Sequence, residues 1–165
     1  MAVLYLANAL GFSPMLVSSL NAIHEDLTGA GFTVLEPFAM SAQEGEKIHE
    51  IKSKEMLDAE SLEQLRELNR QIGEKNRRAI DRADAVVAVL DGGAGVDSGV
   101  AAEIGYAFAR EKVVVGLRGD FRNAGDNPGA IVNLQVEYFI LESGGAILET
   151  IDRVIGFLSA MDGER

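Results

Sequence analysis

Short runs of β-branched and aliphatic residues recur along the chain, and longer segments with helical spacing separate them. Runs of this length are typical of buried strands. Strands that alternate with helices predict right-handed crossovers and a parallel sheet with helices on both faces. We therefore expect an α/β fold, a flavodoxin-like three-layer sandwich with a five-stranded parallel sheet. The predicted strands are residues 3–6, 32–35, 85–90, 113–117 and 136–140.

The sequence predicts some helices more clearly than others. A first helix is predicted over residues 14–28 with Ser13 as its N-cap, and a last helix over 146–158. Residues 38–54 show no clear period. A long helix follows them, and Asn76 falls on its apolar stripe. The apolar residues at three- and four-residue spacing in this helix are Leu62, Leu65, Leu68, Ile72, Ala79, Ile80 and Ala83.

Length and composition predict one compact domain over residues 1–165. A chain of 165 residues with 47% hydrophobic content is able to bury a substantial core. The sequence contains no cysteine, which excludes disulfides, thiolate catalysis and cysteine-based metal sites. His24 and His49 lack a metal-ligand spacing, so we interpret both as surface histidines and predict no metal site.

The charge balance limits the possible partners. A formal net charge of -11 would repel a phosphate backbone, so we expect no nucleic acid partner. No apolar run approaches the roughly 20 residues that span a bilayer, so we expect no membrane association. No Lys or Arg precedes Lys47, which argues against a signal peptide and favours a cytoplasmic location. A small neutral substrate suits such a chain better.

The most informative stretch begins with a glycine-rich loop at Asp91 and continues into a helix that is apolar except at Glu103. An ionised carboxylate in such a helix costs several kcal/mol unless it is paired. The nearby helix N-terminus partly offsets that cost and favours an ionised nucleophile. We therefore interpret Glu103 as functional. The alternative is a structural Glu that is bonded to a Tyr hydroxyl or to backbone amides.

Other residues around this loop have structural alternatives as well. The glycines at 93, 95 and 99 depart from the dinucleotide-binding spacing, and no phosphate-loop pattern is present. Asp97 suits the N-cap of the helix that begins near Ser98. Asn76 is compatible with a satisfied core amide, and Tyr5 with a strand residue at the sheet edge. In a flavodoxin-like sheet, residues 5–12 would lie beside 91–99 at the ligand-binding edge.

Taken together, these residues resemble the nucleoside 2-deoxyribosyltransferase family. The resemblance begins at Tyr5 in Leu-Tyr-Leu-Ala and continues through the segment from Asn76 to Val87. Its most specific part is Asp97-Ser-Gly-Val-Ala-Ala-Glu103-Ile-Gly, and it ends with Asn133-Leu134.

The resemblance implies a role for each matched residue. Glu103 would attack the anomeric carbon and form a covalent 2-deoxyribosyl enzyme, which an incoming base resolves with retention, as in retaining glycosidases. Tyr5 would orient Glu103. Asp97 and Asn133 would bind the sugar 5'-hydroxyl, with Asn133 supplied by a neighbouring subunit. Gly99 belongs to the same substrate-binding block. No cofactor or metal is implied.

One departure concerns the proton donor. Many family members carry Asp where this chain has Asn76, and an amide does not act as a general acid at neutral pH. Asn76 would then only orient the base, and Asp91 at the end of the preceding strand is a substitute. The sequence leaves the choice between purine and pyrimidine bases open.

Three functional hypotheses follow. The first is transfer of 2-deoxyribose between a 2'-deoxynucleoside and a free nucleobase, in a dimer or hexamer of identical subunits with shared active sites. The second is hydrolysis of 2'-deoxynucleosides or their 5'-monophosphates by the same fold. Related nucleotide hydrolases carry small hydroxyl residues at the positions of Asp97 and Asn133, which favours nucleosides for this chain. The third is a non-catalytic flavodoxin-like binding module.

Overall fold

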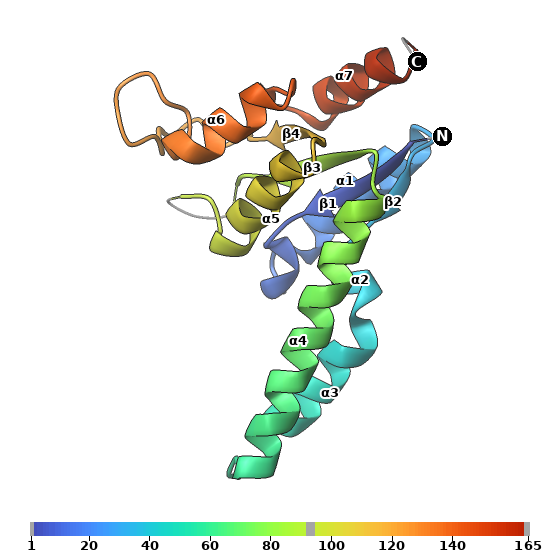
Figure 1. Cartoon of the computed structure of the whole chain (residues 1–165), viewed down its shortest axis with the longest axis vertical. Coiled ribbons are helices and arrows are strands. Elements are labelled where there is room, and N and C mark those ends of the chain that lie inside the picture. The colour runs from blue at the N-terminus through green and yellow to red at the C-terminus, as the bar shows by residue number, and fades with distance from the viewer. Residues whose placement is uncertain (1, 92–94, 164–165) are drawn as a thin grey trace.

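The computed structural model describes residues 2–91 and 95–163, which form a five-stranded parallel sheet with helices on both faces (Figure 1). The strand order is β2-β1-β3-β4-β5, so the order reverses between β1 and β3. This is the flavodoxin-like order, and the predicted α/β class is confirmed. The strands are β1 (Val3–Ala7), β2 (Thr33–Leu35), β3 (Ala85–Val89), β4 (Val113–Leu117) and β5 (Ile147–Leu148).

Alternate strand residues face two separate apolar cores, because successive side chains of a strand point to opposite faces. Leu4 and Leu6 of β1 pack in one core with α1 (Val17–Gly29) and α7 (Ile151–Gly163). Tyr5 and Ala7 pack in the other core. That second core also receives buried side chains from α4 (Ala59–Arg82), α5 (Ser98–Ala109) and α6 (Leu134–Glu142).

Two predictions near the C-terminus are wrong. The strand predicted over 136–140 is helix α6, whose N-cap is Asn133. The fifth strand is the two-residue β5, which lies inside the predicted last helix, and α7 begins only at Ile151. Val136 and Ile140 are four residues apart and both buried, which is the spacing of one helix face. A strand would have placed them on one face as well, so alternation alone did not distinguish the two structures.

The first helix also begins later than predicted. A 3-10 turn, η1 (Leu10–Phe12), follows β1, and α1 starts after Leu16 with no side-chain cap. Ser13 accepts a hydrogen bond from the Leu16 backbone N–H through its carbonyl oxygen instead. This turn holds Phe12 at the carboxyl end of the sheet.

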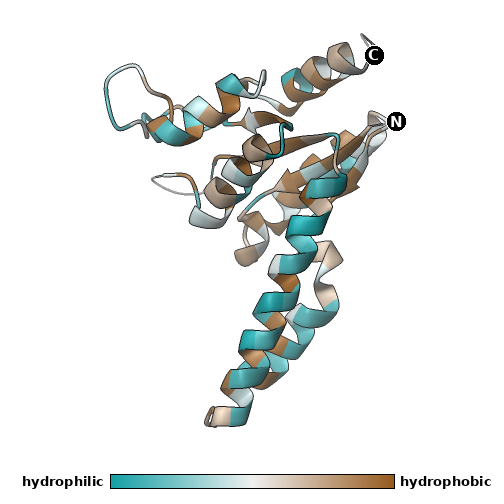
Figure 2. Ribbon diagram, in the orientation of Figure 1, coloured by the Kyte–Doolittle hydropathy of each residue, from teal (hydrophilic) through white to brown (hydrophobic). Residues whose placement is uncertain are grey.

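Two antiparallel helices project from the sheet on the side of β1 (Figure 1). The segment without a clear period contains α2 (Pro37–Met40) and α3 (Ala42–Lys52), and α3 packs against α4. We call α3 together with residues 59–76 of α4 the arm. Its colours in Figure 2 are mostly hydrophilic, whereas the strands and α5 are mostly hydrophobic. Ile51 and Leu68 are its buried apolar residues.

An ion pair fixes the base of the arm. Lys75 on α4 donates hydrogen bonds to Glu44 on α3 at 2.7 Å and to the backbone carbonyl of Met40 at 3.1 Å. Asp58 caps the start of α4 by accepting from the Ser61 backbone N–H.

None of the helices in the described ranges is long and apolar enough to cross a bilayer.

Candidate active site

A cleft of 470 Å³ opens at the carboxyl end of β1, beside the point where the strand order reverses. Ligands of open α/β sheets bind at this position. The cleft lies between η1, α2 and α3 on one side and α4 and α5 on the other. Its lining residues are Asn8, Phe12, Pro37, Phe38, Ser41, Ala42, Gly45, Ile48, Lys52, Ile72, Asn76, Asp97, Gly99, Val100 and Glu103.

Glu103 lies in the cleft at the meeting point of three elements. The Tyr5 hydroxyl, from β1, donates a 2.6 Å hydrogen bond to its Oε1. The Asn76 amide nitrogen, from α4, donates to the same oxygen at 3.3 Å. Within the described part of the chain, Oε2 of Glu103 accepts no hydrogen bond. The carboxylate is therefore held by one oxygen and leaves the other available to a ligand.

Burial dominates the acid–base properties of this group. Desolvation raises the pKa of Glu103 to about 7, and the hydrogen bonds from Tyr5 and Asn76 oppose that rise. The negative charges of Asp97 and Glu36 raise the same pKa further. Burial, followed by the charge of Glu103, raises the pKa of the Tyr5 hydroxyl well above its usual range. Tyr5 consequently stays protonated and acts as a hydrogen-bond donor.

Asp97 caps the N-terminus of α5, as its position in the sequence suggested. Its Oδ1 accepts hydrogen bonds from the backbone N–H groups of Gly99 at 2.8 Å and Val100 at 3.1 Å, which caps α5. A Cβ on Gly99 would lie 3.0 Å from that oxygen, so glycine gives the cap its room. Asp97 and Gly99 also line the cleft with Glu103. Capping therefore does not remove Asp97 from the site.

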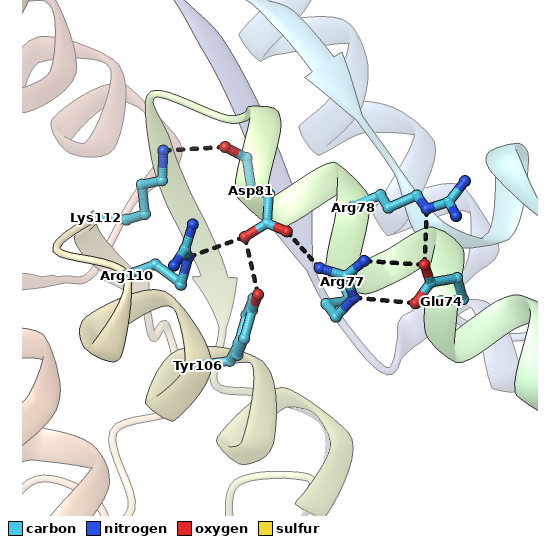
Figure 3. A network of polar contacts seen from close by, with 7 residues as sticks. All are labelled: Glu74, Arg77, Arg78, Asp81, Tyr106, Arg110 and Lys112. Carbon is cyan, nitrogen blue, oxygen red and sulfur yellow. Dashed lines mark hydrogen bonds and ion pairs between the residues drawn. The ribbon is translucent and has the colours of Figure 1, made fainter.

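A polar network fixes the register of α4 against α5 (Figure 3). Asp81 accepts hydrogen bonds from the Tyr106 hydroxyl at 2.9 Å, from Arg110 at 3.0 Å and from Arg77 at 2.7 Å. Lys112 donates to the backbone carbonyl of Asp81 at 3.2 Å. Tyr106 follows Glu103 by one helical turn, and Asp81 follows Asn76 by little more than one. The network therefore sets how Asn76 meets Glu103.

The sequence analysis missed Asn8 and Lys52, which line the cleft, and Glu36, which bonds to Asn8. Asn8 is buried, donates to Glu36 at 3.0 Å and accepts from the Leu10 backbone N–H at 3.1 Å. Glu36 caps α2 by accepting from two backbone N–H groups. Asn8 and Glu36 each directly follow a strand, so their position at the carboxyl edge was a usable signal. Lys52 lies in the segment for which no element was predicted.

A family model described as nucleoside 2-deoxyribosyltransferase matches residues 4–138, which include Tyr5, Asn76, Asp97 and Glu103. The chain belongs to this family. A search of curated protein sequences gives no significant match. The described residues contain no group of three or more His, Asp or Glu side chains that is arranged to hold a metal ion.

Several solved structures share the fold of this protein. A conserved protein from Enterococcus faecalis V583 is 21% identical with a TM-score of 0.65, covering 94% of this chain and 96% of its own. A 2-desoxiribosyltransferase from Leishmania mexicana is 20% identical with a TM-score of 0.63, at coverages of 95% and 96%. A CMP N-glycosidase from Clostridium botulinum is 16% identical with a TM-score of 0.55, at 95% and 98%.

Three predicted site residues are not among those that line the cleft. They are Asp91, Asn133 and Tyr5, and Tyr5 is fully buried and reaches the site through its hydrogen bond to Glu103. Asp91 accepts hydrogen bonds from the backbone N–H groups of Gly119 at 2.7 Å and Asp120 at 3.0 Å. Asn133 caps α6 and donates to Asp126 at 3.0 Å. The glycines considered for dinucleotide binding include residue 93, and residues 92–94 lie outside the described ranges.

Proposed function

We propose that the protein transfers 2-deoxyribose between nucleobases through a covalent glycosyl-Glu103 intermediate. The observation that carries the proposal is the half-buried Glu103, fixed through one oxygen by Tyr5 and Asn76 at the rim of a substrate-sized cleft. Pockets of a few hundred Å³ accommodate small-molecule ligands. Membership of the nucleoside 2-deoxyribosyltransferase family supports the same chemistry.

The reaction takes two displacements at the anomeric carbon. In the first, the free oxygen of Glu103 forms a bond to C1' while the bond from C1' to the base nitrogen breaks, and the base leaves with the electron pair. In the second, a nitrogen of the incoming base forms a bond to C1', the ester to Glu103 breaks, and the nitrogen loses its proton. Two inversions give retention. The departed base gains one proton, so the exchange is balanced.

Tyr5 and Asn76 act on the carboxylate rather than on the sugar. Their hydrogen bonds to Oε1 orient Oε2 and favour the ionised form that an oxocarbenium-like transition state requires. The remaining Asn76 oxygen is buried and has no partner in the described part of the chain. This oxygen is available to a polar edge of the base, so Asn76 would hold Glu103 through its nitrogen and orient the base through its oxygen. The backbone bonds of Asp91 do not support the predicted role of proton donor for that residue.

The direct test is product analysis with a 2'-deoxynucleoside, with and without a second free base. A new nucleoside is the expected result. Free sugar alone would favour the hydrolase, and no reaction with any donor would favour a binding module. Glu103→Ala should abolish exchange, whereas Glu142→Ala, an exposed carboxylate at the end of α6, should leave it unchanged. A 2-fluorinated arabinosyl nucleoside should leave a sugar adduct on Glu103, detectable by mass.

Asp97 gives a reason to expect nucleosides rather than nucleotides. Its second carboxylate oxygen accepts no hydrogen bond in the described ranges, and a charge-assisted bond to a neutral 5'-hydroxyl would use it. A 5'-phosphate beside the same carboxylate would be repelled. We expect kcat/KM for 2'-deoxynucleosides to exceed that for their 5'-monophosphates at least a hundredfold.

Asp97→Ser should narrow this gap, because serine keeps the N-cap of α5 while the negative charge is removed. Circular dichroism should show unchanged helix content, and kinetics with a nucleoside and its monophosphate should show the two values converging. A wild-type preference for monophosphates would contradict the role of Asp97. It would favour the hypothesis that the protein hydrolyses 2'-deoxynucleoside 5'-monophosphates.

A further inference from the structure

The cleft continues beyond Asn76 along the inner face of α3. Ala42, Gly45, Ile48 and Lys52 line it at the three- and four-residue spacing of one helix face. Ile72 on α4 lines the opposite wall. The rings of Phe12 and Phe38 meet edge to face with centroids 4.8 Å apart on a third side. This end of the cleft, beside the arm, is therefore a slot with apolar walls. A flat ring system is the kind of ligand that fits it.

Lys52 is the only cationic side chain among the described residues that line the cleft. It forms no ion pair or hydrogen bond with any described residue, unlike Lys75, which is paired with Glu44. Side chains of a helix lean toward its N-terminus, so the solvent-exposed Lys52 side chain would extend back along the face that carries Ile48 and Gly45. The far end of the slot consequently carries an unpaired positive charge.

Two buried polar atoms near the other end of the slot are also unpaired. Ser41 Oγ and Asn76 Oδ1 have no hydrogen-bond partner in the described ranges, and Ser41 is only 6% exposed. Because Asn76 donates its amide N–H to Glu103, the free amide atom is an acceptor. Leaving a buried polar group of this kind without a hydrogen-bond partner costs free energy. They indicate a ligand with polar edges rather than a purely apolar one.

We propose that Lys52 is a catalytic residue that donates a hydrogen bond to a carbonyl oxygen of the departing nucleobase. The inference rests on the proposed function. A base that leaves with the electron pair of the glycosidic bond carries negative charge, and an exocyclic carbonyl oxygen takes up part of it. An ammonium group at that oxygen stabilises the transition state more than the ground state. Lys52 thus compensates for the amide at position 76, and 6-oxopurine donors are favoured over 6-aminopurines.

The test compares 2'-deoxyinosine with 2'-deoxyadenosine, which share the purine ring and differ at the 6-position. Lys52→Met should lower kcat/KM for 2'-deoxyinosine at least thirtyfold, mostly through kcat, and that for 2'-deoxyadenosine less than threefold. Lys52→Arg should restore part of the loss. Lys47→Met removes the same charge from α3 on the side away from the cleft and should change neither value twofold.

Equal losses with both donors, or no loss with 2'-deoxyinosine, would overturn the role of Lys52 while exchange by the wild type still upheld the proposed function. A wild type that is inert with both donors would overturn both proposals. A second variant tests whether the base enters this slot. An added side chain at Gly45 meets no atom within 4 Å, so Gly45→Leu should fill the slot without a clash and lower kcat/KM for both purine donors at least tenfold.

Gly73→Leu is the matched control for that substitution, because Gly73 is also helical, exposed and free of neighbours within 4 Å, but lies outside the cleft lining. It should leave both values within twofold of the wild type. Unchanged kinetics in the Gly45→Leu variant would place the base elsewhere and overturn the proposal.

Discussion

Glu103 is a residue whose expected function opposes stability. Burial raises its pKa from 4.5 to about 7, so the folded state disfavours the ionised form. The folded protein binds the proton more tightly than the unfolded chain, so stability is full below pH 4.5 and falls as the pH rises to about 7. At about 1.4 kcal/mol per pKa unit, the loss is at most about 3 kcal/mol, since solvent partly screens the side chain.

Glu103→Gln should therefore stabilise the protein at pH 8 by up to about 3 kcal/mol and change little at pH 4. Urea denaturation at the two pH values measures the difference. Glu142→Gln, which changes an exposed carboxylate, should show no such pH dependence. A wild type that is more stable than Glu103→Gln at pH 8 would contradict the effect of burial on this group.

Tyr5 should control the pH at which Glu103 becomes a nucleophile. The wild-type kcat/KM should rise with pH through about 7, because only the ionised carboxylate attacks. Tyr5→Phe removes the hydrogen bond that lowers the pKa of Glu103 and should move this limb to higher pH. The activity at pH 6 should then fall more than the activity at pH 9. An unshifted limb with uniformly lower activity would assign Tyr5 a packing role only.

How much of the site the sequence predicts depends on how strongly each residue contrasts with its neighbours. Glu103 stands out in the sequence because it is the one carboxylate in an apolar helix. The structure places Asn76 and Asp97 in the same cleft and Tyr5 beside it, and the catalytic role stays a prediction. Lys52 was not predictable, because the inner face of α3 carries Ala, Gly, Ile and Lys and has no apolar stripe to mark it.

At the scale of elements, the contact between α4 and α5 positions the site. Tyr106→Phe removes the α5 hydroxyl that bonds to Asp81 and leaves the two arginine contacts in place (Figure 3). One such hydrogen bond contributes about 1 kcal/mol to stability. We expect a loss of that size in thermal or urea unfolding, together with lower kcat, because Asn76 and Glu103 lose part of their common support. A lower stability with unchanged kcat would limit the network to a structural role.

The sequence predicts long elements with a clear period and misjudges short ones. The central strands and α4 were recovered because their burial patterns are unambiguous. Residues 134–142 are rich in β-branched and aromatic side chains, and the periods of strand and helix coincide at Val136 and Ile140. Only the packing of α6 on the sheet decides between the two. A two-residue strand such as β5 is too short to leave any period.

At the scale of the whole molecule, the expectation that the chain assembles with copies of itself rests on Asn133. This residue begins α6 and does not line the cleft of its own chain, whereas the family resemblance gives it to the active site of a neighbour. The segment from Ile131 to Leu141 also exposes apolar side chains to solvent. They are Ile131, Leu134, Tyr138 and Leu141, which are 45–53% exposed. Such a surface favours an interface between copies of the chain.

We therefore expect a homo-oligomer, a dimer or hexamer, with shared active sites. Mixing inactive Glu103→Ala and Asn133→Ala subunits should restore part of the activity, because one site in a mixed pair would contain both native residues. Mixing Glu103→Ala with itself after the same treatment is the control. A monomer at micromolar concentration in sedimentation analysis would refute the assembly.

The arm also matters for how such enzymes diverge. Neither of the two apolar cores around the sheet contains a residue between 41 and 78, so the arm packs as a separate unit. The ion pair between Lys75 and Glu44 joins its two helices at the base. Mutations along α3 can accumulate without weakening the sheet that carries Tyr5. On the proposed function, the choice of nucleobase can therefore change between descendants while the chemistry at the sugar stays the same, provided that Asn76 at the base of the arm is retained. Grafting a foreign arm onto this sheet, with Asn76 kept, is then a route to new acceptor bases.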